Sequence, residues 1–479
     1  MPAFSLEPSR TARCAELRAL AEERLRPLAG KGEPGRVNRP LVAELGRLGL
    51  LERLFTSGAL DLCLMRESLA QACTEAETAL ALQGLGAHPV HAHGTPAQRE
   101  RWLPAVSEGS AVAAFALSEP GAGSDAAALG LRAEGEPGGR GAAERSGTAL
   151  REQAPADSKA ARSRAERESA WQGAPGSRAE RESAWQGAPG SRAEGESAWQ
   201  GAPGSRAEGE SAWQGVAGSH TRRESAPSAD PAAQPVAVVD GASRWRLTGE
   251  KCWISNAPEA DFYTVFARTT PGAGARGVTA FLVPADRPGL SGTALDMLSP
   301  HPIGALAFDA VPVSADDVLG EVDRGFRVAM GTLNLFRPSV GAFAVGMAQA
   351  ALDATLAHTA RRDAFGGKLR DLQSVAHTVA EMALRTDAAR LMVYAAATAY
   401  DEGAPDVPKR AAMAKLLATE TAQYVVDTAV QLHGARALQR GHLLEHLYRE
   451  VRAPRIYEGA SEVQRDIIAK ELYADLEVS

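Results

Sequence analysis

A carboxylate near the C-terminus has the surroundings that point most directly to chemistry. Glu458 lies in "RIYEGASEVQRDIIAK", residues 455–470, between Tyr457 and the small residue Gly459. Two interpretations compete: an ordinary acidic residue near a helix N-terminus, or a base directed into an apolar cavity. Burial in an apolar pocket would raise the pKa of a carboxylate and make it a stronger base. Because strongly perturbed carboxylates are uncommon, the residue by itself favours the first interpretation.

Two further stretches carry polar and small residues that suit a binding site. "AFALSEPGAGSDAAA", residues 114–128, contains a glycine-rich loop able to bring backbone amides close to a ligand. It is not the dinucleotide fingerprint, because the third glycine is missing and no βαβ unit follows. "GEKCWISNA", residues 249–257, places Trp253 in a strand, where an aromatic usually belongs to the core, and Ser255 and Asn256 in a turn. Each stretch alone is more typical of ordinary structure than of a site.

The elements that must position these residues follow from the spacing of apolar side chains. Residues 10–110 and the chain from 324 onward have the three- and four-residue spacing of helices. Residues 113–133 and 236–313 contain short runs rich in β-branched and aromatic residues, which predict strands. The sequence therefore predicts an α+β fold: an N-terminal helical domain at 1–112, a β domain at 113–316 and a C-terminal helical domain at 317–479.

A low-complexity insertion at 135–234 interrupts the predicted β domain. Residues 165–220 are four near-copies of a 14-residue unit, each with one tryptophan. Between 134 and 234 the large aliphatic residues are Leu150 and Val216, too few to offset the entropy of ordering the segment. The composition favours a disordered insertion that arose by duplication. A tandem motif that binds a partner is the alternative.

Composition excludes several classes of protein. The net charge of −7 and the lack of a dense Lys/Arg patch argue against nucleic-acid binding. Uninterrupted apolar runs stay well short of the ~20 residues of a membrane span, and the first residues lack the apolar core of a signal peptide. The four cysteines show neither metal-ligand nor disulfide spacing, which is typical of a protein in a reducing cytoplasm.

Taken together, the motifs resemble those of the acyl-CoA dehydrogenase family, flavoenzymes that oxidise the α,β bond of acyl-CoA thioesters. The resemblance rests on "SEPGAGSD", "WISN", "RRDAFGGKL" and "IYEGASEVQRDIIAK", in the family's order, and covers nearly all of 10–475 except the insertion. It implies a barrel-like middle domain, a C-terminal four-helix bundle and a homotetramer. It also implies FAD as cofactor, acyl-CoA as substrate and electron-transferring flavoprotein as acceptor.

The resemblance also assigns roles to individual residues. Glu458 matches the catalytic base that removes the α proton while hydride leaves the β carbon for FAD. The implied substrate contacts are Ser124, Asn334, Arg337, Tyr457 and Gly459. The implied FAD contacts are Phe115, Leu117, Ser118, Gly123, Ser124, Trp253, Ser255, Arg362, Phe365, Gln373, Gln431, Gly434, Ala460 and Glu462. Among these, Arg362 and Phe365 resemble residues that reach the FAD of a neighbouring subunit.

The sequence departs from the family pattern at several positions. Ala435 and Ala437 replace two glycines, so their methyl groups are expected to crowd the FAD of the adjacent subunit. Asn334 stands where many members have Asp, which leaves one substrate contact open. Some members take their base from the position of Phe336, and phenylalanine cannot serve, so Glu458 has no rival there.

Three histidines and two rival functions complete the expectations. His88, His91 and His93 resemble a metal cluster by number, but their spacing also fits a turn near the substrate cleft, so no metal is expected. The first rival function is an oxidase or monooxygenase on the same flavin scaffold. The second is a scaffold without activity, whose tryptophan repeats bind a partner.

Overall fold

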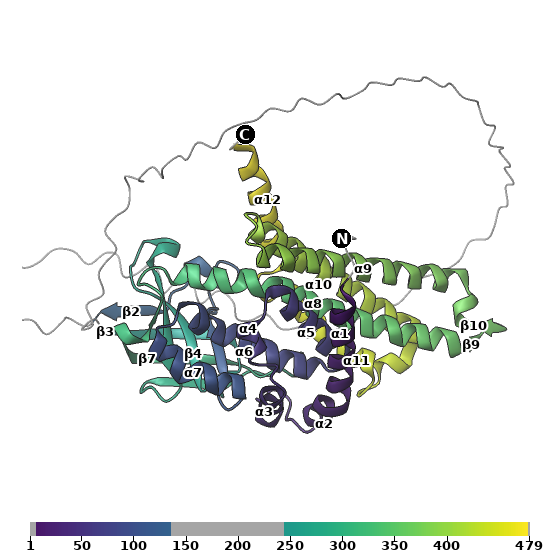
Figure 1. The fold of residues 1–479 in the computed structure, drawn as a ribbon, viewed down its shortest axis with the longest axis horizontal. Coiled ribbons are helices and arrows are strands. Elements are labelled where there is room, and N and C mark those ends of the chain that lie inside the picture. The colour runs from purple at the N-terminus through teal and green to yellow at the C-terminus, as the bar shows by residue number, and fades with distance from the viewer. Residues whose placement is uncertain (1–5, 136–243, 478–479) are drawn as a thin grey trace, which may run out of the picture. The chain divides into compact units, whose positions relative to one another are not determined.

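The computed structural model describes residues 6–135 and 244–477, with the backbone alone for 475–477. Within this part of the chain, helices precede a β sheet and further helices follow it (Figure 1). This order confirms the α+β arrangement predicted from the sequence. The 14-residue repeats, Leu150, Val216 and the predicted strand residues 236–243 lie outside the described residues.

The N-terminal helices pack against one another and against the first strand. They are α1 (Pro8–Leu20), which continues through a π-helical turn (Ala21–Leu25) into α2 (Arg26–Ala29), then α3 (Arg39–Arg47), α4 (Arg53–Thr56), α5 (Ala59–Ala72), α6 (Thr74–His93) and α7 (Pro96–Glu108). A Cβ added to Gly86 of α6 would lie 2.6 Å from the backbone nitrogen of Ala114. Gln83 also donates to the carbonyl of Ala111 and accepts from the amide of Ala113, both at 2.7 Å. The helix and the strand after it are therefore held at very close range.

The middle region is one sheet whose strands come from distant parts of the chain. The strands are β1 (Ala113–Ala116), β2 (Arg132–Gly135), β3 (Arg244–Ser255), β4 (Phe262–Arg268), β5 (Val278–Pro284), β6 (Leu290–Ala294), β7 (Ile303–Ser314) and β8 (Val318–Leu319). Their order is β6-β7-β3-β2-β4-β5-β8, and β1 pairs in parallel with β4. β2 is antiparallel to β3, with Gly135 opposite Trp245. The closed, barrel-like form stays a prediction.

The C-terminal region consists of long helices around a central one. The elements are α8 (Gly325–Arg361), the hairpin strands β9 (Asp363–Ala364) and β10 (Gly367–Lys368), then α9 (Gln373–Asp401), α10 (Val407–His433), α11 (Leu443–Glu450) and α12 (Ser461–Glu477). α8 is long and apolar enough to cross a membrane, but 72% of its most apolar window is buried inside the protein. It packs against α5, α9 and α10, so its apolar composition is that of a core helix.

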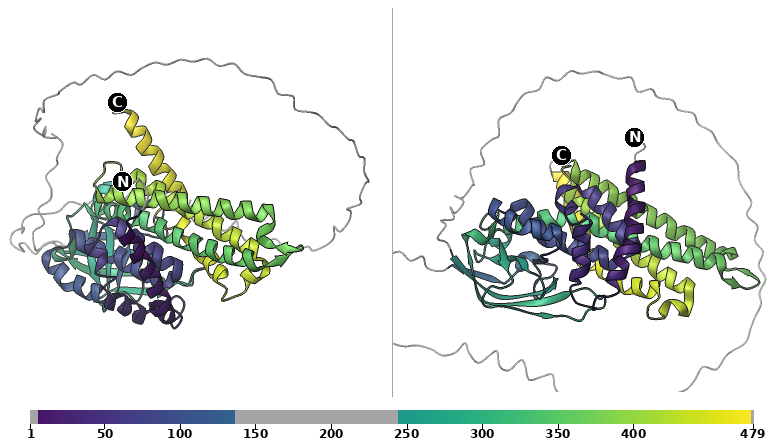
Figure 2. Two further views of the ribbon diagram at one scale, coloured as in Figure 1. Left: turned by 45° about the vertical axis from the view of Figure 1, so that its right-hand side comes forward. Right: turned by 60° about the horizontal axis from the view of Figure 1, so that its bottom comes forward.

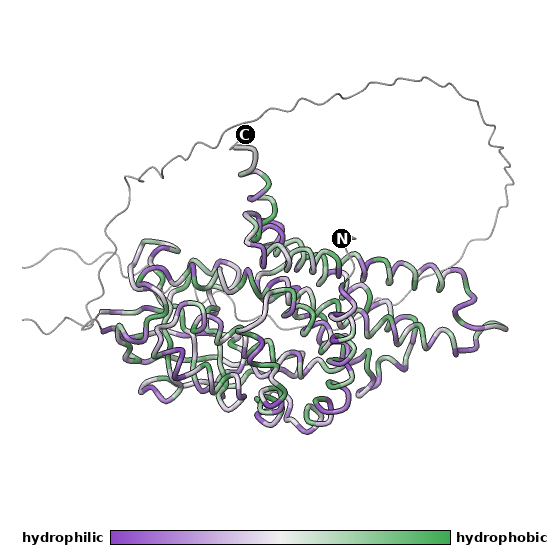
Figure 3. The backbone as a smooth tube through the Cα atoms, viewed as in Figure 1, coloured by the Kyte–Doolittle hydropathy of each residue, from purple (hydrophilic) through white to green (hydrophobic). Residues whose placement is uncertain are grey.

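Apolar side chains form separate cores in the helical and the sheet regions. One core joins α1, α5 and α6 to α8, α9 and α10, and two further cores cover the two faces of the sheet. Figure 3 shows hydrophilic and hydrophobic residues interspersed along the helices. The chain ends in α12, which projects from the neighbouring helices in two views (Figures 1 and 2).

Candidate active site

The loop after β1 carries the first group of expected cofactor contacts. Phe115 and Ser118 are half-buried and Leu117 is buried, whereas Gly123 and Ser124 are exposed. A Cβ added to Gly123 would meet nothing within 4 Å. The backbone of the loop at Gly123 is therefore accessible, so its amides are free to approach a ligand.

A buried ion pair fixes the base of this loop. Lys251 of β3 donates to a carboxylate oxygen of Glu119 at 2.8 Å and to the carbonyl of Leu117 at 2.9 Å. Glu119 also accepts from the backbone amides of Gly130 at 2.5 Å and Leu131 at 2.9 Å. Burial lowers the pKa of Lys251 to about 8, against the opposing effect of Glu119. The pair joins the loop to both β2 and β3.

Trp253 is not a core aromatic, contrary to the expectation for tryptophan in a strand. Its backbone φ is +58°, its side chain is 48% exposed, and the pairing of β3 with β7 shifts register between Lys251 and Ile254. Such an irregularity turns a side chain away from the regular face of a sheet. The following Ser255 is half-buried. Asn256 is buried and donates to the carbonyl of Ala113 at 2.8 Å, which ties the end of β3 to β1.

Glu458 occupies a left-handed turn just before α12. Its φ is +52° and that of Gly459 is +96°. Three side chains donate to the carbonyls of this turn. Arg337 of α8 bonds the carbonyl of Glu458 at 3.2 Å, and Lys415 of α10 bonds that of Gly459 at 2.7 Å. Gln464 of α12 reaches both carbonyls, at 3.2 and 2.8 Å. The turn is therefore held from three helices.

The carboxylate of Glu458 has the properties that a base needs. One of its oxygens is buried and has no hydrogen-bond partner among the described residues. Burial raises its pKa above the usual 4.5, and the charges of Arg66, Lys415 and Arg337 oppose that rise. A buried acceptor without a partner is costly, so this oxygen is available to a group that enters from outside the chain. These properties are compatible with the second interpretation of Glu458, and its role as a base stays a prediction.

A second buried charge pair lies beside the turn. Arg66 of α5 pairs with Glu77 of α6 and donates to the hydroxyl of Ser339 at 2.7 Å. Arg66 is close enough to lower the pKa of Glu458. Tyr457, an expected substrate contact, is 36% exposed. Asn334 accepts from Arg337 at 3.3 Å, so these two expected substrate contacts adjoin the same turn, whereas Ser124 lies in the loop after β1.

The three histidines lie on a helix and not in a turn. His88, His91 and His93 belong to α6, and the ring of His88 lies 6.1 Å from that of Phe336, centroid to centroid. Burial lowers the pKa of His88 to about 4, so its imidazole is neutral. Phe336 itself is buried. In the described ranges, no group of three or more His, Cys, Asp or Glu residues has the geometry to hold a metal.

Several expected cofactor contacts lie far from Glu458. Arg362 follows α8 and stands 25 residues beyond Arg337, roughly 37 Å along a helix. Phe365, at the tip of the β9–β10 hairpin, has a φ of +52° and is 91% exposed. Exposed residues at the same end are Gln373, Gln431 and Gly434. The stacking of His358 on His433, with centroids 4.2 Å apart, joins the ends of α8 and α10. Geometry therefore separates this group from Glu458 of the same chain.

The two alanines that replace glycines face different surroundings. Ala435 is exposed, whereas Ala437 is buried in the helical core. The methyl group of Ala437 therefore does not face outward, and crowding of a cofactor from another subunit is expected from Ala435 alone. Ala460 is half-buried beside the turn of Glu458, and Glu462 is exposed on α12.

Sequence reasoning did not single out Lys415, Gln464, Arg66 or Glu77. For Lys415 the sequence does contain a signal, a lysine inside the apolar run "AAMAKLLA". Because a charged residue is seldom fully buried unless it has a partner, such a lysine predicts a specific buried contact. The contacts of Lys415 with Gly459 and of Arg66 with Ser339 join segments far apart in the chain, and helical periodicity alone does not show which segments meet.

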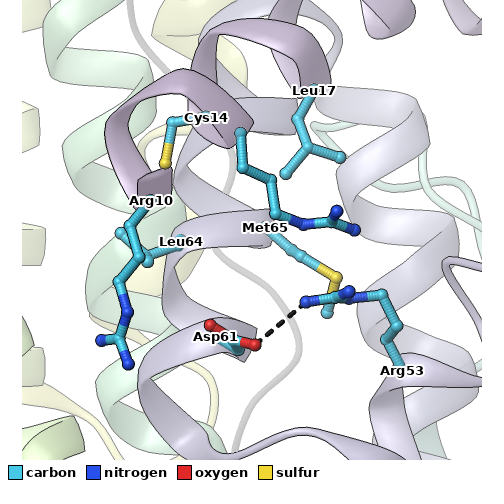
Figure 4. A pocket seen from close by; sticks show the side chains of 8 residues that line it. Arg10, Cys14, Leu17, Arg53, Asp61, Leu64 and Met65 are labelled. Carbon is cyan, nitrogen blue, oxygen red and sulfur yellow. Dashed lines mark hydrogen bonds and ion pairs between the residues drawn. The ribbon is translucent and has the colours of Figure 1, made fainter. Parts of the chain in front are cut away.

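Two cavities occur elsewhere among the described residues. One of about 20 Å³, between α1, α4 and α5, is lined by residues that include Arg10, Cys14 and Met65, and Arg53 pairs there with Asp61 at 2.9 Å (Figure 4). It has room for a single water molecule. A larger one, of about 140 Å³, is lined by residues of α2, α3 and α6 and by residues 300–302. Neither is lined by Glu458.

Comparisons with known proteins agree with this geometry. Models of the N-terminal, middle and C-terminal domains of acyl-CoA dehydrogenases match residues 9–110, 224–311 and 323–473. A probable acyl-CoA dehydrogenase, FadE25 of Mycobacterium tuberculosis, is 38% identical over 239 residues, 49% of this chain and 61% of that protein. Human mitochondrial short-chain specific acyl-CoA dehydrogenase is 40% identical over 244 residues, 50% of this chain and 59% of that protein. The matched region is thus less than two thirds of each relative's length.

Solved structures share the fold. Butyryl-CoA dehydrogenase from Megasphaera elsdenii superimposes with a TM-score of 0.71 at 25% identity, covering 98% of this chain and 99% of that one. A glutaryl-coenzyme A dehydrogenase complex gives a TM-score of 0.72 at 24% identity, covering 98% and 96%. Three domain models in order, together with this shared fold, place the chain in the acyl-CoA dehydrogenase family.

Proposed function

We propose that this protein oxidises the α,β bond of an acyl-CoA thioester to the 2-enoyl-CoA, with Glu458 as the base. The observation that carries the proposal is the buried oxygen of Glu458, which has no hydrogen-bond partner within the described ranges. Its turn is held by donors from three helices, so the carboxylate is fixed in place without being neutralised by a direct ion pair to those donors.

The residues on the sheet side fit the cofactor of the family, which is FAD-dependent. Trp253 exposes a large apolar surface that a planar ring can cover, and the loop at 119–125 offers accessible backbone. We propose that Phe115, Leu117, Ser118, Gly123, Ser124, Trp253 and Ser255 hold FAD, with Ala460 and Glu462 near it. When bound, FAD supplies the acceptor for the hydride that leaves the β carbon.

In this proposal, Glu458 transfers the proton and other residues of the chain position the substrate. Glu458 takes the α proton, because burial makes its carboxylate a stronger base than one in water. Hydrogen bonds to the thioester oxygen acidify that proton by stabilising the enolate-like charge, and the backbone amide of Glu458 is a donor in the right segment. Tyr457, Gly459, Asn334, Arg337 and Ser124 are the proposed substrate contacts. The small Gly459 leaves room for the substrate's approach.

The experiment that tests the function is anaerobic titration of the FAD-loaded protein with a panel of acyl-CoAs. Loss of the flavin absorbance at 450 nm, roughly the usual maximum of oxidised flavin, with enoyl-CoA formed in equal amount is the expected result. The panel begins with butyryl-CoA, because the human relative is named short-chain specific. A protein that stays colourless with added FAD, or a flavin that no acyl-CoA reduces, contradicts the proposal.

The electron acceptor is a separate part of the proposal. We propose electron-transferring flavoprotein, the acceptor implied by the family. Mixing the reduced protein with air in a stopped-flow instrument separates this from an oxidase or monooxygenase. Slow reoxidation by oxygen is expected, together with fast reoxidation by added electron-transferring flavoprotein. Fast reoxidation in air contradicts it.

We also propose that the active form is an oligomer, a homotetramer as in the family. Arg362, Phe365, Gln373, Gln431 and Gly434 lie far along the helices from Glu458, so they suit the FAD of another copy. Exposed apolar side chains on the hairpin, on α9 and on the projecting α12 support a buried interface, among them Phe365, Leu384, Leu472 and Tyr473. A monomer in sedimentation that still holds FAD tightly contradicts this assembly.

A further inference from the structure

A fully buried lysine lies behind the turn that carries Glu458. Lys415 has 0% exposure and sits in the middle of α10, among alanines and other small residues. Burying an ammonium group costs several kcal/mol even after the protein relaxes, so its contacts must compensate. Its ammonium donates to the carbonyl of Gly459 at 2.7 Å. This bond connects α10 directly to the residue that follows the proposed base.

The turn needs such support because its backbone is unfavourable. A non-glycine residue in the left-handed region costs about 1–3 kcal/mol, and Glu458 is one, with φ of +52°. Gly459 has a φ of +96°, which favours glycine, and a Cβ there would displace the side-chain amide of Gln464 from its hydrogen bonds to the turn. Lys415 and Gln464 both hold the carbonyl of Gly459, so the direction of the Glu458 side chain depends on them.

Lys415 also sets the charge around the carboxylate. Cations approach Glu458 from α5, α8 and α10, and the first of them is already paired with Glu77. Of the anions near Lys415, Glu420 is held by the hydroxyl of Ser461 at 2.6 Å and by Arg455 at 2.9 Å, and Glu462 is exposed on α12. The titratable and charged groups that face this cluster are Arg66, Glu77, Arg337, Lys415, Glu420, Glu450, Tyr457, Glu458 and Glu462.

We propose that Lys415 is a positioning residue for the reaction: its ammonium holds the turn of Glu458 and its charge keeps that carboxylate ionised. The inference rests on the proposed function, in which Glu458 is the base. It gives α10 a part in proton removal that acts through Glu458 and requires no contact between α10 and the substrate. A neutral side chain at 415 would leave Glu458 protonated at a pH where the native protein has a carboxylate.

The test compares Lys415→Gln and Lys415→Met with Lys415→Arg, all as FAD-loaded full-length proteins. Lys409→Gln is the matched control, because Lys409 lies on the same helix and pairs with Asp406. The probe is the 3-thia analogue of whichever acyl-CoA reduces the native protein fastest. Its α proton can be removed, but sulfur at the β position has no hydride to give. The long-wavelength absorbance of the bound α-carbanion is recorded against pH.

The neutral variants should need a higher pH to form the band, by about one pH unit or more, as expected when an opposite charge near a carboxylate is lost. Binding of the analogue should change little, and Lys415→Arg and Lys409→Gln should follow the native profile. Neutral variants that follow the native profile overturn the inference, and so does an equal shift in Lys409→Gln. If both neutral variants fail to fold, the role of Lys415 is structural and the inference is wrong.

The same data separate this inference from the proposed function. If the native protein forms no band with any analogue and no acyl-CoA reduces its flavin, the proposed function fails. If the native protein forms the band and the neutral variants match it at every pH, the proposed function stands and Lys415 has no such role.

Discussion

The protein buries charge in two parts of the chain that carry expected site residues, the loop after β1 on the sheet side and the turn before α12 on the helix side, and the two are built differently. On the sheet side, Glu119 accepts three hydrogen bonds, from Lys251 and from the amides of Gly130 and Leu131. On the helix side, one oxygen of Glu458 has no partner in the described part of the chain, although three cations lie near it. Both oxygens of Glu119 accept hydrogen bonds, whereas one oxygen of Glu458 accepts none from the described residues.

We expect the two carboxylates to play different parts. Glu119 uses both of its oxygens to hold the loop after β1, whereas Glu458 keeps one buried oxygen available to a ligand. The donors around Glu458 bond its backbone carbonyl and that of Gly459, so they fix the residue without occupying its side chain. We therefore expect a substitution of Glu458 to affect the reaction rate and a substitution of Glu119 to affect stability.

The largest effect is expected from Glu458→Gln. Glutamine keeps the shape of the side chain and removes the base, so flavin reduction by substrate should slow by about 10²–10⁴-fold. FAD binding and the thermal unfolding midpoint should remain close to native. Stopped-flow measurement of flavin reduction checks the rate, and a near-native rate would show that Glu458 is not the base.

Glu119→Ala should have the opposite profile. Removing one partner leaves Lys251 buried without its anion, which costs about 3–5 kcal/mol of stability. The loop at 119–125 should loosen, and FAD should dissociate more readily. Urea unfolding followed by circular dichroism measures the loss. A variant with native stability would mean that the sheet side does not depend on this pair.

Gly86→Ala tests how closely α6 is held to β1. The added Cβ would lie 2.6 Å from the nitrogen of Ala114 and 2.7 Å from the carbonyl carbon of Ala113, both backbone atoms. Overpacking of this kind costs about 1–3 kcal/mol. Gly331→Ala is the control, since a Cβ there meets nothing within 4 Å and alanine suits a helix better. Equal unfolding midpoints for the two variants would contradict the close approach.

The smallest effect is expected from deleting 135–234, which lies almost entirely outside the described residues. β2 and β3 are antiparallel neighbours, with Gly135 opposite Trp245, so a short connection can join them. Loop-closure entropy changes by only ~0.6 kcal/mol per doubling of length, so the deletion should be neutral or slightly stabilising. Native FAD content and activity are expected. Loss of FAD or aggregation would show that the deleted segment packs on the sheet region.

Tryptophan fluorescence gives a second readout of that deletion. Four of the seven tryptophans lie in the repeats, so the full-length protein should show red-shifted emission that iodide quenches readily. Both properties should vanish in the deletion variant. Unchanged emission would contradict the prediction that the repeats are solvated.

The sequence predicts the order of the elements but does not predict the contacts between distant segments. Local periodicity predicts the order of helices and strands that the structure has, and the motif around Glu458 predicts the base, which stays a prediction. Lys415 and Arg66 were missed because their contacts cross between helices that are distant in the chain. Trp253 was expected in the core because strand alternation does not reveal a register shift, and that shift gives it a left-handed backbone. Domain limits at 112 and 316 stay predictions.

The pair that anchors the loop on the sheet side has a consequence for how the chain folds. Lys251 and Glu119 are separated by 132 residues, and most of that span is the insertion. Pairings between distant residues slow folding, because the chain loses loop entropy before the contact stabilises it. Contacts among α8, α9 and α10 join residues closer in the chain. We therefore expect the C-terminal helices to acquire protection from hydrogen exchange first during refolding, and the loop at 119–125 to acquire it last.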